Sequence, residues 1–204
     1  MTKEEVLKEF RVRELLEAAR RVIGRYGFEG TTIDRVAEEA RVAKGTIYLY
    51  FSTKDELLHA AILVGIRTML IETQRKDRPE LPPLERLHAL VRGQFDIQST
   101  NQDFLKAFFL ESSFVTFEPG DERGEELRRV YVDYLDFVAS VLRSAIVAGA
   151  LRSVDPQFAA FTLIEMLTGT LRRRLLGLVS TPLEDDADRV LDLFLKGTIA
   201  TPCA

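Results

Sequence analysis

The sequence predicts an all-α protein with about nine helices, in which a small three-helix domain precedes a larger helical domain. Three observations lead to this prediction. Apolar residues recur at the i, i+3, i+4, i+7 spacing of an amphipathic helix along most of the chain. Helix-ending and helix-starting residues, such as Gly27 and Asp155-Pro156, bound these segments. No segment alternates apolar and polar residues as a half-buried strand does, and no internal repeat is visible.

The composition is that of a soluble globular protein, with 204 residues, 46% of them hydrophobic and 29% charged. No apolar run reaches the roughly 18 residues that cross a bilayer, and the polar N-terminus lacks the apolar stretch of a signal peptide. We therefore expect a cytoplasmic protein without a membrane partner. The single cysteine, Cys203, excludes an internal disulfide and a cysteine-cluster metal site, and we assign it no role. We expect neither a metal ion nor a cofactor.

The first helix is predicted from about Lys3 to Tyr26, and Gly27 ends it. Its apolar stripe has helical spacing: Leu15, Ala18, Ala19, Val22 and Tyr26. Thr31 or Thr32 can cap a second, short helix. The core face of this second helix repeats the same spacing: Ile33, Val36, Ala37 and Ala40.

The stretch from Val42 to Phe51 is too short to be stable as an isolated helix, so its neighbours must hold it. Ile47 and Phe51 form an i, i+4 pair that gives the stretch a face for packing. The other face presents a cation, a bare backbone, a hydroxyl and two phenols: Lys44, Gly45, Thr46, Tyr48 and Tyr50. These groups suit a polyanion surface and base edges, and none is suited to catalysis. Taken alone, the stretch is also compatible with a helix that carries two surface tyrosines.

These segments follow the plan of a helix-turn-helix DNA-binding domain: a bracing helix, then a helix, a tight turn and a helix with a polar face. Thr53 and Glu56 form a capping box that starts a fourth helix, which runs to about Arg75. Lys54 lies in the first turn of that helix, where a cation is favourable only if an anion such as a phosphate approaches. Residues 1–54 carry a net charge of +2 and the remainder carries −6, which is consistent with DNA binding through one end.

Residues 10–60 resemble the DNA-binding domain of tetracycline-repressor-like (TetR/AcrR-like) transcriptional regulators. The residues that carry the resemblance are Gly27-Phe28, Thr31-Thr32-Ile33, Lys44-Gly45-Thr46-Ile47-Tyr48, Tyr50-Phe51 and Ser52-Thr53-Lys54-Asp55-Glu56-Leu57. The resemblance implies a homodimer that binds a palindromic operator and releases it when a small molecule occupies the C-terminal domain.

The resemblance also implies roles for single residues. Thr32, Lys44 and Lys54 would contact phosphates, and Gly45 would allow the backbone to approach DNA closely. Base edges or phosphates would be contacted by Thr46, Tyr48 and Tyr50. Many relatives have a histidine where this chain has Tyr50, so the use of Tyr50 stays open.

We expect a DNA-binding domain at residues 1–52 and a ligand-binding and dimerisation domain at residues 53–204, linked by a helix at 53–76. The proline-rich segment 77–83 makes the loop after that helix. Further helices are predicted over Leu84–Gln98, Phe104–Phe114 and Glu125–Ala148, and from Asp155-Pro156 and Thr181-Pro182 onwards.

Aromatic residues are frequent in the second domain and can line an apolar pocket between helices. Two carboxylates lie among apolar residues in the sequence, where a desolvated charge is costly unless it is paired. The candidate pocket residues are Phe95, Phe104, Phe108, Glu111, Tyr134, Phe137 and Glu165. For any single aromatic residue, ordinary core packing remains the favoured alternative. For the two glutamates, a salt bridge with an arginine is favoured.

The last two helical segments, 158–179 and 183–199, are apolar on more than one face, so they must be buried on both sides. The same pair of helices from a second subunit is a natural partner, and we predict a two-fold dimer. The candidate interface residues are Phe161, Gly169, Leu171, Leu191 and Phe194.

The favoured function is a ligand-responsive transcriptional regulator, with a repressor favoured over an activator. It would bind palindromic double-stranded DNA as a dimer, and a small apolar or amphipathic effector would release it. The alternative is a helical ligand-binding or interaction protein without sequence-specific DNA binding. An enzyme is favoured still less, because His59 and His88 are the only imidazoles and the chain lacks a nucleophile motif.

Overall fold

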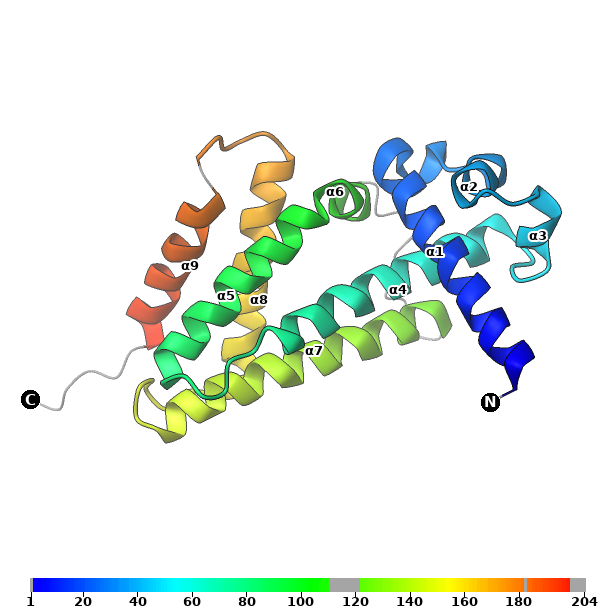
Figure 1. Cartoon of the computed structure of the whole chain (residues 1–204). Coiled ribbons are helices and arrows are strands. Elements are labelled where there is room, and N and C mark those ends of the chain that lie inside the picture. Colours follow the sequence, from blue (N-terminus) through cyan, green and yellow to red (C-terminus); the bar gives the residue numbers. More distant parts are fainter. Residues whose placement is uncertain (1, 111–121, 182, 199–204) are drawn as a thin grey trace, which may run out of the picture. The chain divides into compact units, whose positions relative to one another are not determined.

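The computed structural model describes residues 2–110, 122–181 and 183–198, and over these residues it contains nine helices and no strand (Figure 1). The all-α prediction is therefore confirmed. The helices are α1 (Lys3–Gly30), α2 (Ile33–Ala40), α3 (Lys44–Tyr48), α4 (Lys54–Arg75), α5 (Pro83–Thr100), α6 (Gln102–Leu110), α7 (Glu122–Val147), α8 (Pro156–Leu175) and α9 (Leu183–Thr198). Within the described residues, no helix is both long and apolar enough to cross a membrane.

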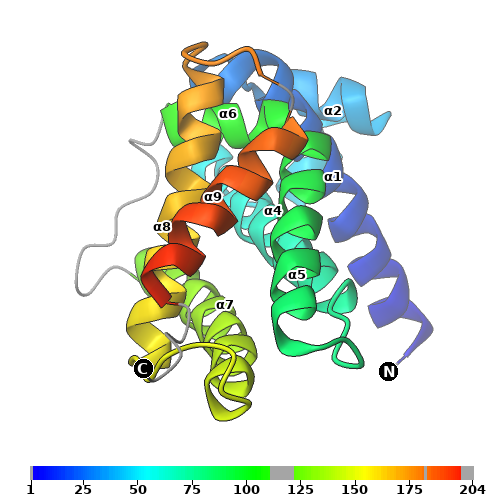
Figure 2. The same cartoon turned by 90° about the vertical axis from the view of Figure 1, so that its left-hand side faces the viewer.

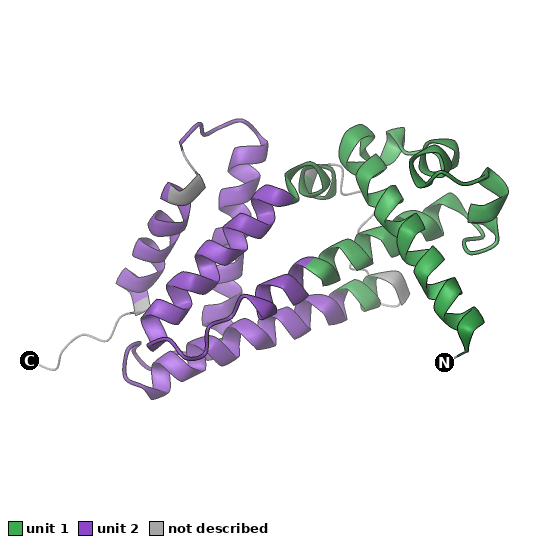
Figure 3. Cartoon of the chain, viewed as in Figure 1, with its two compact units in different colours: residues 1–68, 101–127 green, residues 69–100, 128–204 purple. Residues whose placement is uncertain are grey.

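The chain forms two compact units (Figure 3). Unit 1 consists of Met1–Thr68 and Asn101–Leu127, and unit 2 consists of Met69–Thr100 and Arg128–Ala204. Unit 1 therefore takes in the first part of α4 and all of α6 in addition to the segment 1–52. Helix α4 contributes residues to both units.

Helix α1 contributes a buried face to the core of unit 1, in which Leu15, Ala18 and Ala19 are fully buried. Its helical path is interrupted at Gly27, where φ is 69° and ψ is 179°, and then resumes to Gly30. Glycine adopts this backbone conformation and other residues essentially do not. Tyr26 was predicted to continue the buried stripe, and this is wrong, because its side chain is 51% exposed. The kink brings Phe28 into the core instead, and the Arg35 guanidinium stacks over the Tyr26 ring at 4.3 Å.

Helix α6 packs against α1 and α4 inside unit 1 at two glycines. A Cβ atom at Gly24 would lie 3.2 Å from the Cβ of Asp103, and one at Gly65 would lie 2.8 Å from Cζ of Phe104. The second distance is shorter than carbon atoms tolerate, so a residue other than glycine at position 65 would displace the Phe104 ring. Phe104 itself is 4% exposed. Helix α6 therefore packs closely against α1 and α4 within unit 1.

The described residues of unit 2 form a large apolar cluster. Helix α9 packs against both α5 and α8 (Figure 2). The cluster takes one stripe from each helix: Leu87, Val91 and Phe95 from α5, Tyr134, Val138 and Leu142 from α7, Leu163 and Leu167 from α8, and Leu191 and Phe194 from α9. A fully buried side chain of this size contributes about 1.5–3 kcal/mol. This cluster is therefore the main source of stability in unit 2.

A buried ion pair joins the end of α8 to the start of α9 in unit 2. The Asp186 side chain is 1% exposed, and Nε of Arg174 donates a hydrogen bond to its Oδ2 at 2.5 Å. Arg173 and Arg189 lie farther away, at 3.7 Å and 3.8 Å from Oδ1. The Arg174 side chain is 16% exposed, so both partners of the short contact are largely withdrawn from water.

We expect Asp186→Asn to lower the free energy of unfolding by about 3 kcal/mol, because it leaves the largely buried Arg174 without its counter-charge. Asp192→Asn is the matched control, since the Lys196–Asp192 pair is exposed and contributes about 0.5 kcal/mol or less. Urea denaturation followed by circular dichroism measures both. Equal losses for the two variants would show that the Asp186 pair does not stabilise the unit.

Candidate nucleic-acid interface

The turn between α2 and α3 is tight and has defined geometry. Thr32 caps α2 from an extended conformation, and its hydroxyl accepts a hydrogen bond from the Arg35 backbone N–H at 3.3 Å. Arg41 ends α2 in the left-handed region, with φ 56° and ψ 44°. The backbone N–H of Val42 then donates to the carbonyl of Ala37 at 2.9 Å, which closes the turn. This is the helix, turn and helix that the sequence predicts.

Helix α3 has five residues and no side-chain cap. Ile47 is its buried anchor at 0% exposure, and the Phe51 backbone N–H donates to the Ile47 carbonyl at 3.0 Å. Around Ile47, the residues Lys44, Gly45 and Tyr48 of α3 are exposed. Exposed polar residues therefore flank an apolar anchor, and one of them, Lys44, pairs with Asp34.

The remaining predicted contact residues also belong to unit 1. Thr46 and Tyr50 are half-buried, and Lys54 is the first residue of α4 and also half-buried. The Glu56 backbone N–H donates to the Thr53 hydroxyl at 3.1 Å, as the predicted capping box requires. The Glu56 carboxylate accepts from the Ser52 backbone N–H at 2.7 Å rather than from Thr53, so the reciprocal bond is shifted by one residue.

None of the residues that the structure describes requires glycine at position 45. A Cβ atom built there would meet no atom within 4 Å, and Gly45 is exposed. Glycine inside a helix is less stable than alanine. The benefit of Gly45 must therefore be sought outside the chain.

Sequence reasoning missed one residue of this surface. Leu49 follows α3 directly and is 78% exposed, next to Tyr48 at 49%. Two residues after the buried Ile47, a helical position points to the opposite side, and this spacing could have identified Leu49. An exposed aliphatic side chain beside polar groups suits a thymine methyl group in the major groove.

Several cations of unit 1 are already paired with acidic groups. Glu39 accepts hydrogen bonds from Arg21 at 2.6 Å and from Arg25 at 2.7 Å, and the bond from Arg21 is the main cause that lowers the pKa of Glu39. Lys44 Nζ lies 2.9 Å from Oδ1 of Asp34. The hydrogen bond to Asp34 raises the pKa of Lys44 above its usual value.

The predicted pocket residues are divided between the two units. Phe95 and Tyr134 are buried in the apolar cluster of unit 2, and Phe137 packs against it. Phe104 and Phe108 belong to α6 in unit 1, and their ring centroids are 6.5 Å apart. Glu111 lies outside the described residues.

Glu165 is not desolvated within the single chain, contrary to the reasoning that placed it in an apolar bundle. It is exposed on α8, and its carboxylate accepts a hydrogen bond from the Tyr131 hydroxyl at 3.4 Å. The pKa of Tyr131 is raised to about 12, mainly by burial and then by the Glu165 charge. The apolar spacing of α8 does not cover the whole helix surface, and Glu165 lies on an exposed stripe.

The predicted dimer residues fall into two groups. Phe161 is 47% exposed on α8, and Gly169 is exposed with open space around it. Leu171, Leu191 and Phe194 are buried in the chain itself, at 3%, 1% and 5% exposure. Further exposed apolar residues on and just beyond α8, and on α9, are Phe158, Leu176, Leu178 and Leu193.

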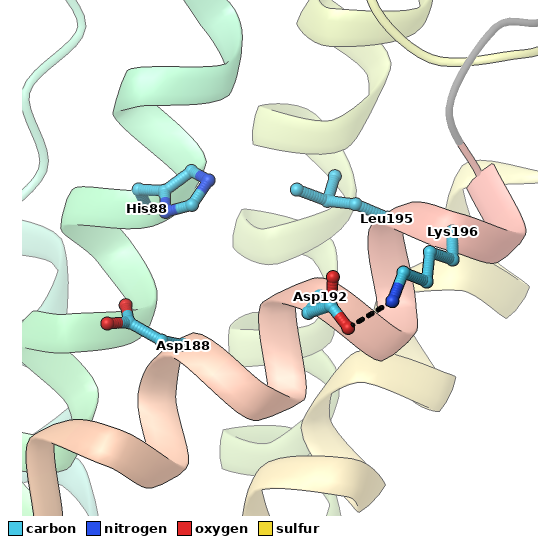
Figure 4. A pocket seen from close by; sticks show the side chains of 5 residues that line it. All are labelled: His88, Asp188, Asp192, Leu195 and Lys196. Carbon is cyan, nitrogen blue, oxygen red and sulfur yellow. Dashed lines mark hydrogen bonds and ion pairs between the residues drawn. The ribbon is translucent and has the colours of Figure 1, made fainter.

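A cleft of about 360 Å³ lies between α5 and α9 (Figure 4). It is lined by His88, Asp188, Asp192, Leu195 and Lys196. Lys196 pairs with Asp192 at 2.7 Å, and Arg92 pairs with Asp188 at 2.9 Å. Both carboxylates of the cleft therefore have a counter-charge within the chain, and none of the predicted pocket residues lines it.

Two family models match the chain. Residues 15–61 match "Bacterial regulatory proteins, tetR family", and residues 80–172 match "Tetracyclin repressor-like, C-terminal domain". The HTH-type transcriptional regulator BetI of Agrobacterium fabrum is 31% identical over 210 residues, which cover 96% of this chain and 95% of that protein.

Solved structures agree with these matches. A Clostridium perfringens protein, described as a candidate fatty acid metabolism regulator, is 26% identical, with a TM-score of 0.72 over 92% of this chain and 100% of its own. The transcriptional regulator FadR of Bacillus subtilis, solved in complex with stearoyl-CoA, shares the fold at 20% identity, with a TM-score of 0.75 over 91% of this chain and 98% of its own. The chain therefore belongs to the TetR family of bacterial regulatory proteins and is a DNA-binding transcriptional regulator.

Proposed function

We propose that the chain is a dimeric repressor that binds a palindromic operator in the cytoplasm and releases it when an apolar or amphipathic effector binds the helical body. The observation that carries this proposal is the exposed face of α3, which presents Lys44, Gly45, Tyr48 and Leu49 over the buried Ile47. A short helix with this division of faces suits insertion into the major groove.

The DNA contacts follow from the chemistry of each side chain. Lys44, Lys54 and the Thr32 hydroxyl are suited to phosphate oxygens, which position the protein without reading sequence. Tyr48 and Leu49 are the exposed large hydrophobic side chains of this surface, and they are suited to base edges and thymine methyl groups. Thr46 and Tyr50 are half-buried, and we assign them supporting contacts.

Gly45→Ala tests the close approach of the α3 backbone to DNA. The added methyl group has open space in the free protein, so the free energy of unfolding should rise by up to about 1 kcal/mol. Operator affinity should fall about tenfold or more, because the same methyl group holds the backbone away from the duplex. Fluorescence anisotropy with the upstream region of the gene measures affinity.

Gly197→Ala serves as the control for this test, since Gly197 is an exposed helical glycine of α9 that also has no atom within 4 Å of an added Cβ. It should leave DNA affinity unchanged. If Gly45→Ala also leaves DNA affinity unchanged, the α3 backbone does not approach the duplex.

A two-fold interface is proposed on the outward face of α8 together with α9. Phe158, Phe161 and Leu193 leave apolar area exposed there, at 70%, 47% and 65%. Gly169 lies on α8 and has open space around it, which permits another helix to approach closely. Leu171, Leu191 and Phe194 lie in the core beneath and would support this surface from inside the chain.

Phe161→Asp should convert the dimer into single chains of 23.1 kDa, because a charge at an apolar interface cannot be solvated. It should also weaken operator binding, because a single chain reads one half-site. Val147→Asp is the control, as Val147 is 83% exposed at the end of α7. Sedimentation velocity gives the mass, and a Phe161→Asp protein that remains dimeric would place the interface elsewhere.

Long-chain acyl-CoA is the effector class that we propose first. The FadR structure of Bacillus subtilis contains stearoyl-CoA, and the Clostridium perfringens relative is described in connection with fatty acid metabolism. The apolar cluster of unit 2 is rich in side chains that suit an acyl chain, including Phe95, Tyr134 and Phe137. We propose that the response reaches the DNA-binding surface through α4 and through α6, which fits tightly at Gly24 and Gly65.

Stearoyl-CoA at saturating concentration should weaken operator binding by about 5- to 150-fold, the range of a typical allosteric coupling. Coenzyme A alone, which lacks the acyl chain, should have little effect. Calorimetric titration establishes binding, and anisotropy on operator DNA measures the coupling. Binding of stearoyl-CoA without a change in operator affinity would rule out this effector as the signal.

A further inference from the structure

Asp34 forms an ion pair with Lys44, the lysine that we propose as a contact to DNA phosphate. Lys44 Nζ lies 2.9 Å from Oδ1 and 3.0 Å from Oδ2, so the ammonium contacts both carboxylate oxygens. Both side chains are exposed, at 51% for Lys44 and 71% for Asp34. Asp34 lies in the first turn of α2, two residues after Thr32, the other candidate phosphate contact on this helix. An acid therefore contacts one candidate phosphate-binding group, Lys44, and lies two residues from another in the sequence.

The other charged groups around this site have different contacts. Glu39 holds Arg21 and Arg25, at 2.6 Å and 2.7 Å. Arg35 donates to the Gly30 carbonyl and stacks on the Tyr26 ring. Lys44 is the ion-pair partner that the described structure gives Asp34. Asp34 also stabilises the N-terminus of α2 modestly through the helix dipole, and this local effect does not require Lys44.

We propose that Asp34 competes with DNA phosphate for Lys44 and thereby sets the affinity of this regulator for DNA. The proposal rests on the function proposed above, in which Lys44 contacts a phosphate. A carboxylate and a phosphate accept hydrogen bonds from the same ammonium donors. When a phosphate approaches, Lys44 must leave Asp34 or share its donors, and the carboxylate charge repels the incoming phosphate in either case.

The competition has a signature in salt dependence. Each phosphate that a lysine neutralises releases condensed counterions, which steepens the fall of affinity with salt by about 0.9 in log–log slope. If Lys44 stays paired with Asp34, the pair carries little net charge. DNA binding then releases fewer counterions from the duplex. Removal of the Asp34 charge should therefore raise affinity at low salt and make its salt dependence steeper.

The test compares Asp34→Asn with Glu38→Gln in the full-length protein. Glu38 is exposed on α2 one turn after Asp34, so the two variants remove the same charge from the same helix. Affinity is measured by anisotropy over a series of salt concentrations, for the upstream region of the gene and for a random duplex. Thermal unfolding shows that each variant is folded.

Asp34→Asn should raise affinity about two- to fivefold for both duplexes, because phosphate contacts are sequence-independent, and it should steepen the salt dependence. Glu38→Gln should change both quantities less. In a Lys44→Met background, the effect of Asp34→Asn should shrink to that of Glu38→Gln, because the lysine that mediates it is gone.

Two outcomes overturn the proposal. A loss of affinity in Asp34→Asn would mean that Asp34 positions Lys44 for DNA. A gain that persists in the Lys44→Met background would mean that Asp34 repels DNA without acting through Lys44. If the unsubstituted protein shows no salt-dependent DNA binding, the proposed function itself fails and the role of Asp34 falls with it.

Discussion

A five-residue helix has no stability of its own in water, so the proposed DNA-binding surface depends on the burial of Ile47. Two buried side chains, Ile47 in α3 and Phe51 just beyond it, fix the orientation of α3 against the core of unit 1. With Ile47 buried, Lys44, Gly45, Tyr48 and Leu49 around it are exposed. Anchor and binding face are therefore one structural feature.

Ion pairs in the described residues range from exposed to buried, and the two most buried ones lie in unit 2. The Lys44–Asp34 pair and the Arg21 and Arg25 contacts to Glu39 are partly or fully exposed, where partners exchange at small cost. In unit 2, Arg86 binds both carboxylate oxygens of Asp77 at 2.9 Å and 2.6 Å with both side chains largely buried, which raises the pKa of Arg86 and anchors the proline-rich loop. Asp186 and Arg174 form the second such contact.

The sequence predicts local features of this protein well. The helices, the Thr32 and Asp155 caps, and the turn before α3 depend on neighbouring residues, and the structure contains them. Contacts between distant segments are less accessible from sequence. Phe104 is an aromatic residue like Phe95, yet it packs against Gly65 in unit 1 while Phe95 is buried in unit 2, and no local pattern distinguishes them. The exposure of Tyr26 depends on the kink at Gly27, which a regular helical spacing does not contain.

Arg41 ends α2 in the left-handed region, which costs a residue with a side chain about 1–2 kcal/mol. Such strain persists only where the surrounding structure over-determines the backbone. The turn is closed by the hydrogen bond from Val42 to Ala37 and bounded by the buried Val36 and Ile47. These local contacts therefore hold the angle between α2 and α3. In the dimer proposed above, an effector would act on the separation between the two copies of this helix pair, because the turn leaves little scope to reshape the pair itself.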